Sequence, residues 1–166
     1  MTTPQGHVLM NPSILVVDDN QHYRTTFCTL LQLCWPTAQL VEAADASQAL
    51  TVFPQQTWDL IILDYQLPTL SGTDLARHLR TRAHAQGQVL PPLVLMSTQP
   101  DAATFARASG AVAFLPKPVD ADMLRTALTP LMPRWSRLPS TARPCGSRMP
   151  GLGVTLTANR WVLIGR

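Results

Sequence analysis

The chain has 166 residues and is 46% hydrophobic, which is enough for one domain with its own core and a short extension. No apolar run approaches the roughly 20 residues of a membrane-spanning helix. The N-terminus also lacks the charged and apolar regions of a signal peptide. We therefore expect a cytoplasmic protein that does not enter the membrane.

The formal net charge of +3 is unevenly distributed along the chain. Residues 1–132 hold all 10 acidic residues and 7 of the 13 basic ones, a net charge of −3, whereas residues 133–166 hold 6 arginines and no acid. A domain that binds nucleic acid concentrates basic residues on its binding surface. The first part of the chain lacks this character, so DNA binding is not expected of the chain as it stands.

The three cysteines are Cys28, Cys34 and Cys145, and no CxxC pair occurs. An odd number without this spacing supports neither a disulfide framework nor a zinc site. We expect Cys28 and Cys34, which fall on one predicted helix, to be small buried or half-buried hydrophobic residues.

Short apolar runs alternate with segments of helical periodicity from residue 14 to residue 132. In chain order, strands are predicted at 14–17, 39–43, 59–63, 92–96 and 112–115, and helices at 21–34, 46–53, 72–85, 101–109 and 120–131. The predicted N-caps from the second helix onward are Ser47 or Asp45, then Ser71, Asp101 and Asp120. Strict alternation of strand and helix predicts an α/β fold with helices on both faces of a parallel sheet.

The two ends of the chain have a different character. Residues 1–12 are predicted to form a disordered arm. Residues 133–166 carry four prolines among serine, threonine, glycine and arginine, which predicts a flexible linker and tail. Residues 152–164 regain apolar character but are too few to build a core. The domain is therefore predicted to span residues 13–132.

Polar side chains follow four of the predicted strands where each strand ends. Asp18 and Asp19 follow the first strand, Asp64 the third, Ser97 the fourth and Lys117 the fifth. Because parallel strands all end at one edge of a sheet, these groups are expected to meet there. A buried carboxylate needs a partner. The sequence therefore predicts a site for a metal ion and an anion.

These residues, with their spacing, resemble the receiver domain of two-component response regulators over residues 13–132. The resemblance is carried by the following motifs: the Asp18-Asp19 pair, the turn Asp64-Tyr65-Gln66-Leu67-Pro68 with Gly72 four residues later, Ser97, and Lys117-Pro118 with Phe114 three residues before the lysine. It implies a flavodoxin-like (βα)5 doubly wound parallel sheet with strand order 2-1-3-4-5. It also implies a Lys117–Pro118 bond of the kind that is commonly cis.

The resemblance further implies a role for each residue. Asp64 would accept a phosphoryl group, and Mg²⁺ would be held by Asp19, by Asp18 in the outer shell, by Asp64 and by the backbone carbonyl of Gln66. Lys117 and Ser97 would contact the phosphoryl oxygens, and Ser97 and Phe114 would form the switch. Taken singly, the acid pair would instead be interpreted as a cap of the first helix, and Phe114 as core.

The implied phosphoryl donor is a sensor histidine kinase or a histidine phosphotransfer protein, and no enzyme activity beyond self-phosphorylation from small donors and autodephosphorylation is expected. A homodimer through the fourth helix, fifth strand and fifth helix is a further implication. Two alternatives stay open. One is a truncated DNA-binding regulator, since residues 156–163 faintly resemble the opening helix of a LuxR-type domain. The other is a phosphatase with Asp64 as nucleophile. It is ranked last, because such enzymes place a DxD pair after the first strand, whereas Asp18-Asp19 lacks that spacing and Asp64 ends the third strand.

Overall fold

The computed structural model of the protein describes residues 11–131. The predictions for residues 1–10 of the N-terminal arm and for the tail after residue 131 lie outside the described residues. This includes the segment that resembles a LuxR-type helix. Residues 11 and 12 lead directly into the first strand.

The described chain forms one parallel sheet in the order β2-β1-β3-β4-β5, which confirms the predicted flavodoxin-like fold class. The strands are β1 (Ser13–Val17), β2 (Gln39–Ala43), β3 (Leu60–Asp64), β4 (Leu93–Ser97) and β5 (Ala113–Pro116). β3 and β4 are buried throughout. Strands buried on both faces require apolar residues at consecutive positions, which explains the unbroken run Leu60-Ile61-Ile62-Leu63.

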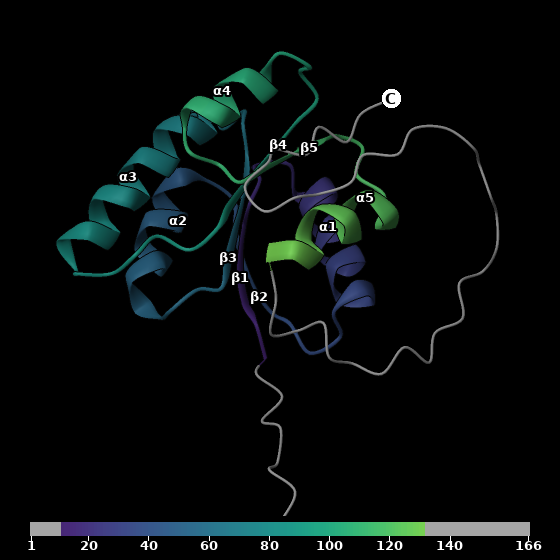
Figure 1. The fold of residues 1–166 in the computed structure, drawn as a ribbon, viewed down its shortest axis with the longest axis horizontal. Coiled ribbons are helices and arrows are strands. Elements are labelled where there is room, and N and C mark those ends of the chain that lie inside the picture. Colours follow the sequence, from purple (N-terminus) through teal and green to yellow (C-terminus); the bar gives the residue numbers. More distant parts are fainter. Residues whose placement is uncertain (1–10, 132–166) are drawn as a thin grey trace, which may run out of the picture.

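Helices cover both faces of this sheet (Figure 1). They are α1 (Gln21–Cys34), α2 (Ala46–Val52), α3 (Gly72–Ala85), α4 (Ala102–Ala108) and α5 (Ala121–Leu128). In Figure 1, α2, α3 and α4 lie on one side of the sheet and α1 and α5 on the other. Short 3-10 turns, η1 (Phe53–Gln55) and η2 (Thr129–Leu131), follow α2 and α5. Each turn contains a proline, which lacks the N–H that a longer α-helix would need.

The core consists of two layers that the sheet separates. On β3, Ile61 and Leu63 pack with α2, α3 and α4, whereas Leu60 and Ile62 pack with α1 and α5. Cys28 is buried and Cys34 is half-buried in the second layer, as expected of small hydrophobic residues. Burial raises the pKa of the Cys28 thiol to about 12, so this thiol stays protonated at neutral pH.

The helix caps decide one alternative that the sequence leaves open. The cap of α1 is Asn20, whose side chain accepts from the backbone N–H of Tyr23 at 3.0 Å. Asp18 and Asp19 therefore do not cap the helix N–H groups. Asp45, Ser71 and Asp120 cap their helices as predicted. The prediction for Asp101 is wrong in part: it lies at the N-cap position, but its side chain makes no capping hydrogen bond because its backbone is already helical.

No helix among residues 11–131 is long and apolar enough to span a membrane. The Lys117–Pro118 peptide bond is cis.

Candidate functional site

The carboxyl ends of β1, β3 and β5 bring Asp18, Asp64 and Lys117 into direct contact. The Lys117 Nζ donates to Asp18 Oδ2 at 2.6 Å and to Asp64 Oδ2 at 2.8 Å. Asp18 is fully buried and Asp64 is 5% exposed. The sheet explains why the two aspartates meet. Val17 and Leu63 are the last register partners of β1 and β3, and the residues that follow them are Asp18, directly after β1, and Asp64, at the end of β3.

A third carboxylate completes an acidic cluster at this edge. Ligand oxygens of Asp18, Asp19 and Asp64 all lie within 4.8 Å of one another, and Asp19 is the exposed member. Lys117 offsets one of the two buried negative charges, so the buried trio keeps one net negative charge and Asp19 adds another. Hard divalent cations such as Mg²⁺ take oxygen ligands of this kind. The donor set therefore fits a divalent cation at the open side of the cluster.

The pKa values of Asp64 and Lys117 are both shifted by burial and by their contact with each other. Burial raises the pKa of Asp64, against the opposing effects of Lys117 and of the backbone N–H of Gln66. Burial alone would lower the pKa of Lys117, but its hydrogen bonds to Asp18 and Asp64 raise it. The lysine thus stays charged, while the ionised form of Asp64 is less favourable than in water.

The turn after β3 holds Asp64 in place through its backbone. The N–H of Gln66 donates to Asp64 Oδ1 at 3.2 Å, and the N–H of Gly72 donates to the carbonyl of Tyr65 at 2.8 Å. A Cβ at Gly72 would collide with the backbone carbonyl oxygen of Asp64 and lie 2.9 Å from Leu95 Cδ2. The start of α3 therefore packs against the phosphoacceptor candidate's own backbone, and only glycine permits this approach. The Gln66 carbonyl as a metal ligand stays a prediction.

Ser97 is the last residue of β4, and Phe114 lies within the neighbouring edge strand β5. Ser97 is 1% exposed, and its Oγ accepts from the N–H of Gln99 at 3.0 Å. Its carbonyl accepts from the N–H of Lys117 at 2.8 Å, which ties the lysine loop to β4. Phe114 is 2% exposed and packs in the core layer beneath α2, α3 and α4.

Sequence analysis missed Tyr23, which lies next to the site. The Lys117 Nζ lies 4.3 Å from the centroid of the Tyr23 ring. The signal was positional: Tyr23 is in the first turn of α1, four residues after Asp19, where a side chain can face the strand ends. Arg24 was missed as well, and its Nη1 donates to the carbonyl of Asp18 at 2.6 Å.

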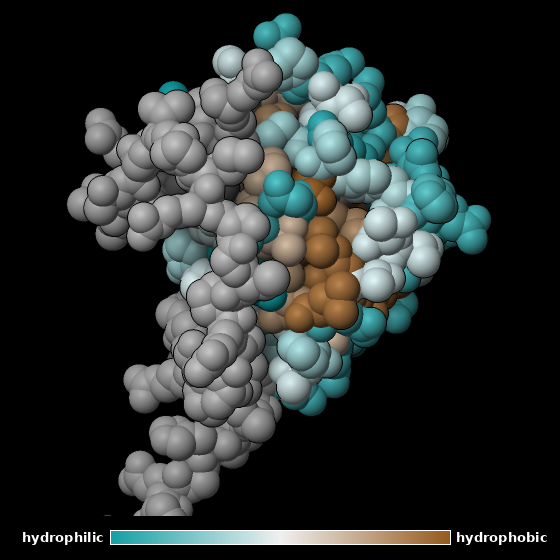
Figure 2. Space-filling view, turned by 90° about the vertical axis from the view of Figure 1, so that its right-hand side faces the viewer, coloured by the Kyte–Doolittle hydropathy of each residue, from teal (hydrophilic) through white to brown (hydrophobic). Residues whose placement is uncertain are grey.

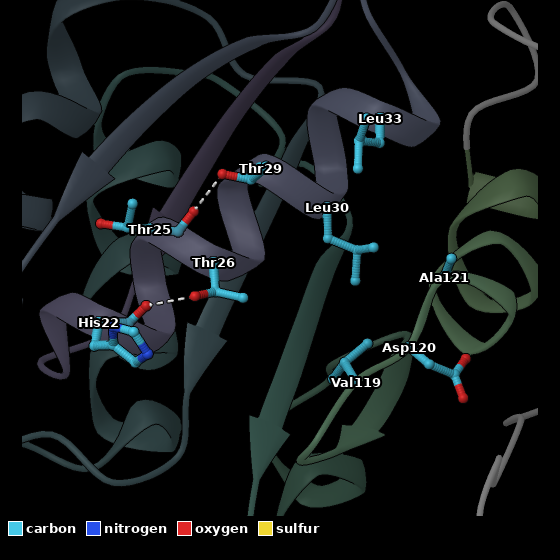
Figure 3. Close-up of a pocket in the computed structure, with 9 residues that line it drawn as sticks. All are labelled: His22, Thr25, Thr26, Thr29, Leu30, Leu33, Val119, Asp120 and Ala121. Carbon is cyan, nitrogen blue, oxygen red and sulfur yellow. Dashed lines mark hydrogen bonds between the residues drawn. The ribbon is translucent and has the colours of Figure 1, made fainter.

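A groove of about 600 Å³ lies between α1 and the start of α5. Its lining is mainly apolar and comes from His22, Thr25, Thr26, Thr29, Leu30, Leu33, Val119, Asp120 and Ala121 (Figure 3). Leu33 is 71% exposed. Figure 2 looks onto this side of the molecule and shows a contiguous hydrophobic area there. Both walls begin at the acidic cluster, since α1 follows Asp19 and Val119 follows Lys117 by two residues.

Comparison with known proteins identifies relatives over this same region. The family model described as the response regulator receiver domain matches residues 14–129. The CAI-1 autoinducer sensor kinase/phosphatase CqsS of Vibrio cholerae is 32% identical over 113 residues, which are 67% of this chain and 16% of that protein. The response regulator MprA of Mycobacterium ulcerans is 32% identical over 126 residues, 75% of this chain and 52% of that protein.

A solved structure agrees with these relatives. The crystal structure of a response regulator receiver domain protein from Clostridium thermocellum has a TM-score of 0.64 and 25% sequence identity, and the match covers 74% of this chain and 95% of that one. The chain spans only 16% and 52% of the two curated relatives. What it shares with them is one domain. The chain therefore belongs to the family of response regulator receiver domains of two-component systems.

Proposed function

We propose that Asp64 accepts a phosphoryl group from the phosphohistidine of a sensor histidine kinase or a histidine phosphotransfer protein. The observation that carries this proposal is the contact of the buried Asp64 carboxylate with Lys117 beside two further carboxylates. A carboxylate is a weak nucleophile, so transfer depends on positioning and on neutralised charge. The site supplies the positioning, and Lys117 supplies part of the neutralisation.

Asp64, Lys117 and Ser97 have separate roles in the proposed transfer. An oxygen of ionised Asp64 attacks phosphorus, a new P–O bond forms, and the P–N bond to the donor imidazole breaks with its electron pair leaving on nitrogen. Lys117, within 2.8 Å of Asp64, binds a phosphoryl oxygen as a compact positive charge. The Ser97 Oγ accepts one hydrogen bond and retains its own proton, which it donates to a second phosphoryl oxygen.

Mg²⁺ is the proposed cofactor because the available ligands are all oxygens. Asp19, Asp64 and the Gln66 carbonyl would hold it directly, with Asp18 in the outer shell, since Asp18 is fully buried and already bonded to Lys117. When bound, the ion offsets the repulsion between the carboxylates and the incoming phosphoryl group. This role fits the net negative charge of the cluster.

Signal output is proposed to start at Ser97 and Phe114. Engagement of the Ser97 hydroxyl by the phosphoryl group would shift the end of β4, and Phe114 on the adjacent β5 would change its packing in response. Leu95 and Phe114 are register partners, so the two strands move together. The face formed by α4, β5 and α5 would then change. This face is the proposed surface for a phosphorylation-dependent homodimer. Phe105 of α4 and Val112, directly before β5, are exposed hydrophobic side chains of these elements.

The groove between α1 and α5 is the proposed docking surface for the phosphoryl donor. A donor must bring its histidine to Asp64, and the apolar groove starts at the same strand ends. An exposed apolar area beside a reactive group is a common feature of protein interaction sites.

The receiver acts in the cytoplasm as a signalling domain, with no enzyme activity beyond self-phosphorylation from small donors and autodephosphorylation. The phosphatase alternative is disfavoured because the acid pair after β1 lacks the DxD spacing and Asp64 ends β3. A DNA-binding output would require residues beyond 131.

The test is phosphorylation by a small donor. The full chain is incubated with Mg²⁺ and acetyl phosphate, and the intact mass is measured. The parent chain is expected to gain one phosphoryl group, and Asp64→Asn is expected to gain none. Asp101→Asn, a change at an exposed aspartate outside the site, is the matched control and should gain the group like the parent. The absence of an adduct in the parent with and without Mg²⁺ would contradict the proposal.

A further inference from the structure

We infer that Tyr23 is a positioning residue for Lys117, whose ammonium it holds against its ring face at the phosphorylation site. This inference rests on the proposed function of Asp64. The Nζ atom lies 4.3 Å from the ring centroid, within the range of a cation–π contact. The same Nζ donates to Asp18 and Asp64, so the ring is a third group in contact with the ammonium.

The ring is itself fixed by the core. Tyr23 stacks on Phe27 one helical turn later, with ring centroids 6.1 Å apart and an interplanar angle of 14°. Phe27 is 2% exposed and belongs to the core layer beneath α1 and α5. Tyr23 packs against this layer too. The Tyr23 ring that contacts the lysine is therefore held in place by its packing on Phe27 and the core.

The ring contact, and not the hydroxyl, carries the interaction. The Tyr23 hydroxyl oxygen is buried and forms no hydrogen bond with Asp18, Asp64 or Lys117. Burial raises the pKa of this hydroxyl, and the backbone of Val119 opposes that effect. A hydroxyl that served to hold the site would be bonded to one of its members. The aromatic face is thus the functional part, and phenylalanine should replace tyrosine with little loss.

The contact has a specific use during phosphorylation. A lysine has a long, flexible side chain with several rotatable bonds, and its cost of ordering is high. When Asp64 becomes an acyl phosphate, it no longer offers the carboxylate that pairs with Lys117. The ring contact is independent of the charge on Asp64, so it keeps the ammonium near the phosphoryl oxygens in both states.

The test compares Tyr23→Leu with Tyr23→Phe in the full chain. The phosphorylation rate constant with Mg²⁺ and acetyl phosphate is expected to fall about tenfold in Tyr23→Leu, the factor expected for losing a largely desolvated cation–π contact. Tyr23→Phe is expected to stay within about twofold of the parent. In a Lys117→Ala background, Tyr23→Leu should have no additional effect, because the residue acts through the lysine.

A second measurement does not depend on phosphorylation. In the NMR spectrum, the Lys117 ε-methylene protons of the parent and of Tyr23→Phe should be shifted upfield by the ring current, and Tyr23→Leu should remove the shift. Equal defects in Tyr23→Phe and Tyr23→Leu, or an unshifted lysine in the parent, would overturn the inference. If the parent forms no adduct but its lysine is shifted, the proposed function fails while the contact stands.

Discussion

At the scale of the residue, the buried Asp64 carboxylate lowers the stability of the fold and is also the group proposed to accept the phosphoryl group. Its carboxylate is buried, and burial raises its pKa above the ordinary value despite the neighbouring lysine. The folded chain therefore holds an ionised group in a less favourable environment than the unfolded chain does. Groups needed for chemistry are often kept at such a cost to stability.

Because ionised Asp64 is unfavourable in the folded protein, we expect Asp64→Asn to increase stability in a pH-dependent way. Since the pKa of Asp64 in the folded protein lies above its ordinary value of 3.8, the folded state binds more protons between the two values, and stability falls as pH rises through this window. Each unit by which the two pKa values differ contributes about 1.4 kcal/mol. Urea unfolding without divalent metal should show the advantage of Asp64→Asn growing as pH rises above 3.8 and staying constant once pH exceeds the pKa of Asp64 in the folded protein. A constant difference would contradict this account.

Gly72 matters to the site because its backbone lies against the backbone carbonyl of Asp64. Replacement by alanine forces a Cβ onto the backbone of Asp64, so α3 or the end of β3 must move. We expect Gly72→Ala to lower the free energy of unfolding by about 1 to 3 kcal/mol, as overpacking does, and to slow phosphorylation by acetyl phosphate.

Gly87→Ala is the matched control for Gly72→Ala. Gly87 has φ +67° with open space around it, so alanine there costs stability through the backbone and leaves the site untouched. Thermal unfolding and the intact-mass assay separate the two effects. If both variants are phosphorylated at the parent rate, the contact between Gly72 and Asp64 has no role in the site.

At the scale of the element, α1 has three separate contacts along its length. Its first turn holds Tyr23 against Lys117, its middle packs Phe27 and Leu31 into the core, and its outer side forms one wall of the groove with Leu30 and Leu33. The helix thus connects the reactive edge of the sheet with the exposed hydrophobic area seen in Figure 2.

This arrangement predicts that Leu33 affects transfer from a protein donor and not from a small one. Leu33 is 71% exposed, so Leu33→Asp should change the free energy of unfolding by less than about 0.5 kcal/mol. Transfer from a phosphorylated histidine phosphotransfer protein that serves the parent chain should fall about tenfold, as for loss of an interface contact worth more than about 1 kcal/mol. Phosphorylation by acetyl phosphate should be unchanged.

Val89→Asp provides the control, because Val89 is 94% exposed and does not line the groove. It should transfer like the parent with both donors. A Leu33→Asp variant that accepts from the protein donor at the parent rate would place the docking surface elsewhere.

At the scale of the whole molecule, the sequence predicts the sheet and the site edge well, since both depend on simple patterns. Four apolar residues in a row with an acid behind them define β3, and helical spacing defines α1 and α3 with the bounds that the structure has. The third, fourth and fifth strands each begin and end one residue later than predicted. This shift moves Asp64 and Ser97 into the strands themselves.

The rest depends on contacts between distant parts of the chain. Tyr23 and Lys117 are far apart in sequence, and the place of Tyr23 in the first turn of α1 indicates that it can face the strand ends but not that it meets Lys117. The spacing of the motif identifies Gly72. The reason that this position needs glycine is the close approach of α3 to the backbone of Asp64, which only the folded structure shows. The groove between α1 and α5 likewise needs the two helices side by side.

Chemical trapping of the acyl phosphate can show whether Asp64 is the phosphoacceptor. The full chain, treated with Mg²⁺ and acetyl phosphate, is reduced with borohydride, which converts an acyl phosphate of aspartate to homoserine. Fragmentation mass spectrometry of the tryptic peptide between Arg24 and Arg77 then identifies the modified residue. We predict homoserine at position 64 alone, and homoserine at Asp45, Asp59 or Asp74, or at none of these positions, would contradict the claim.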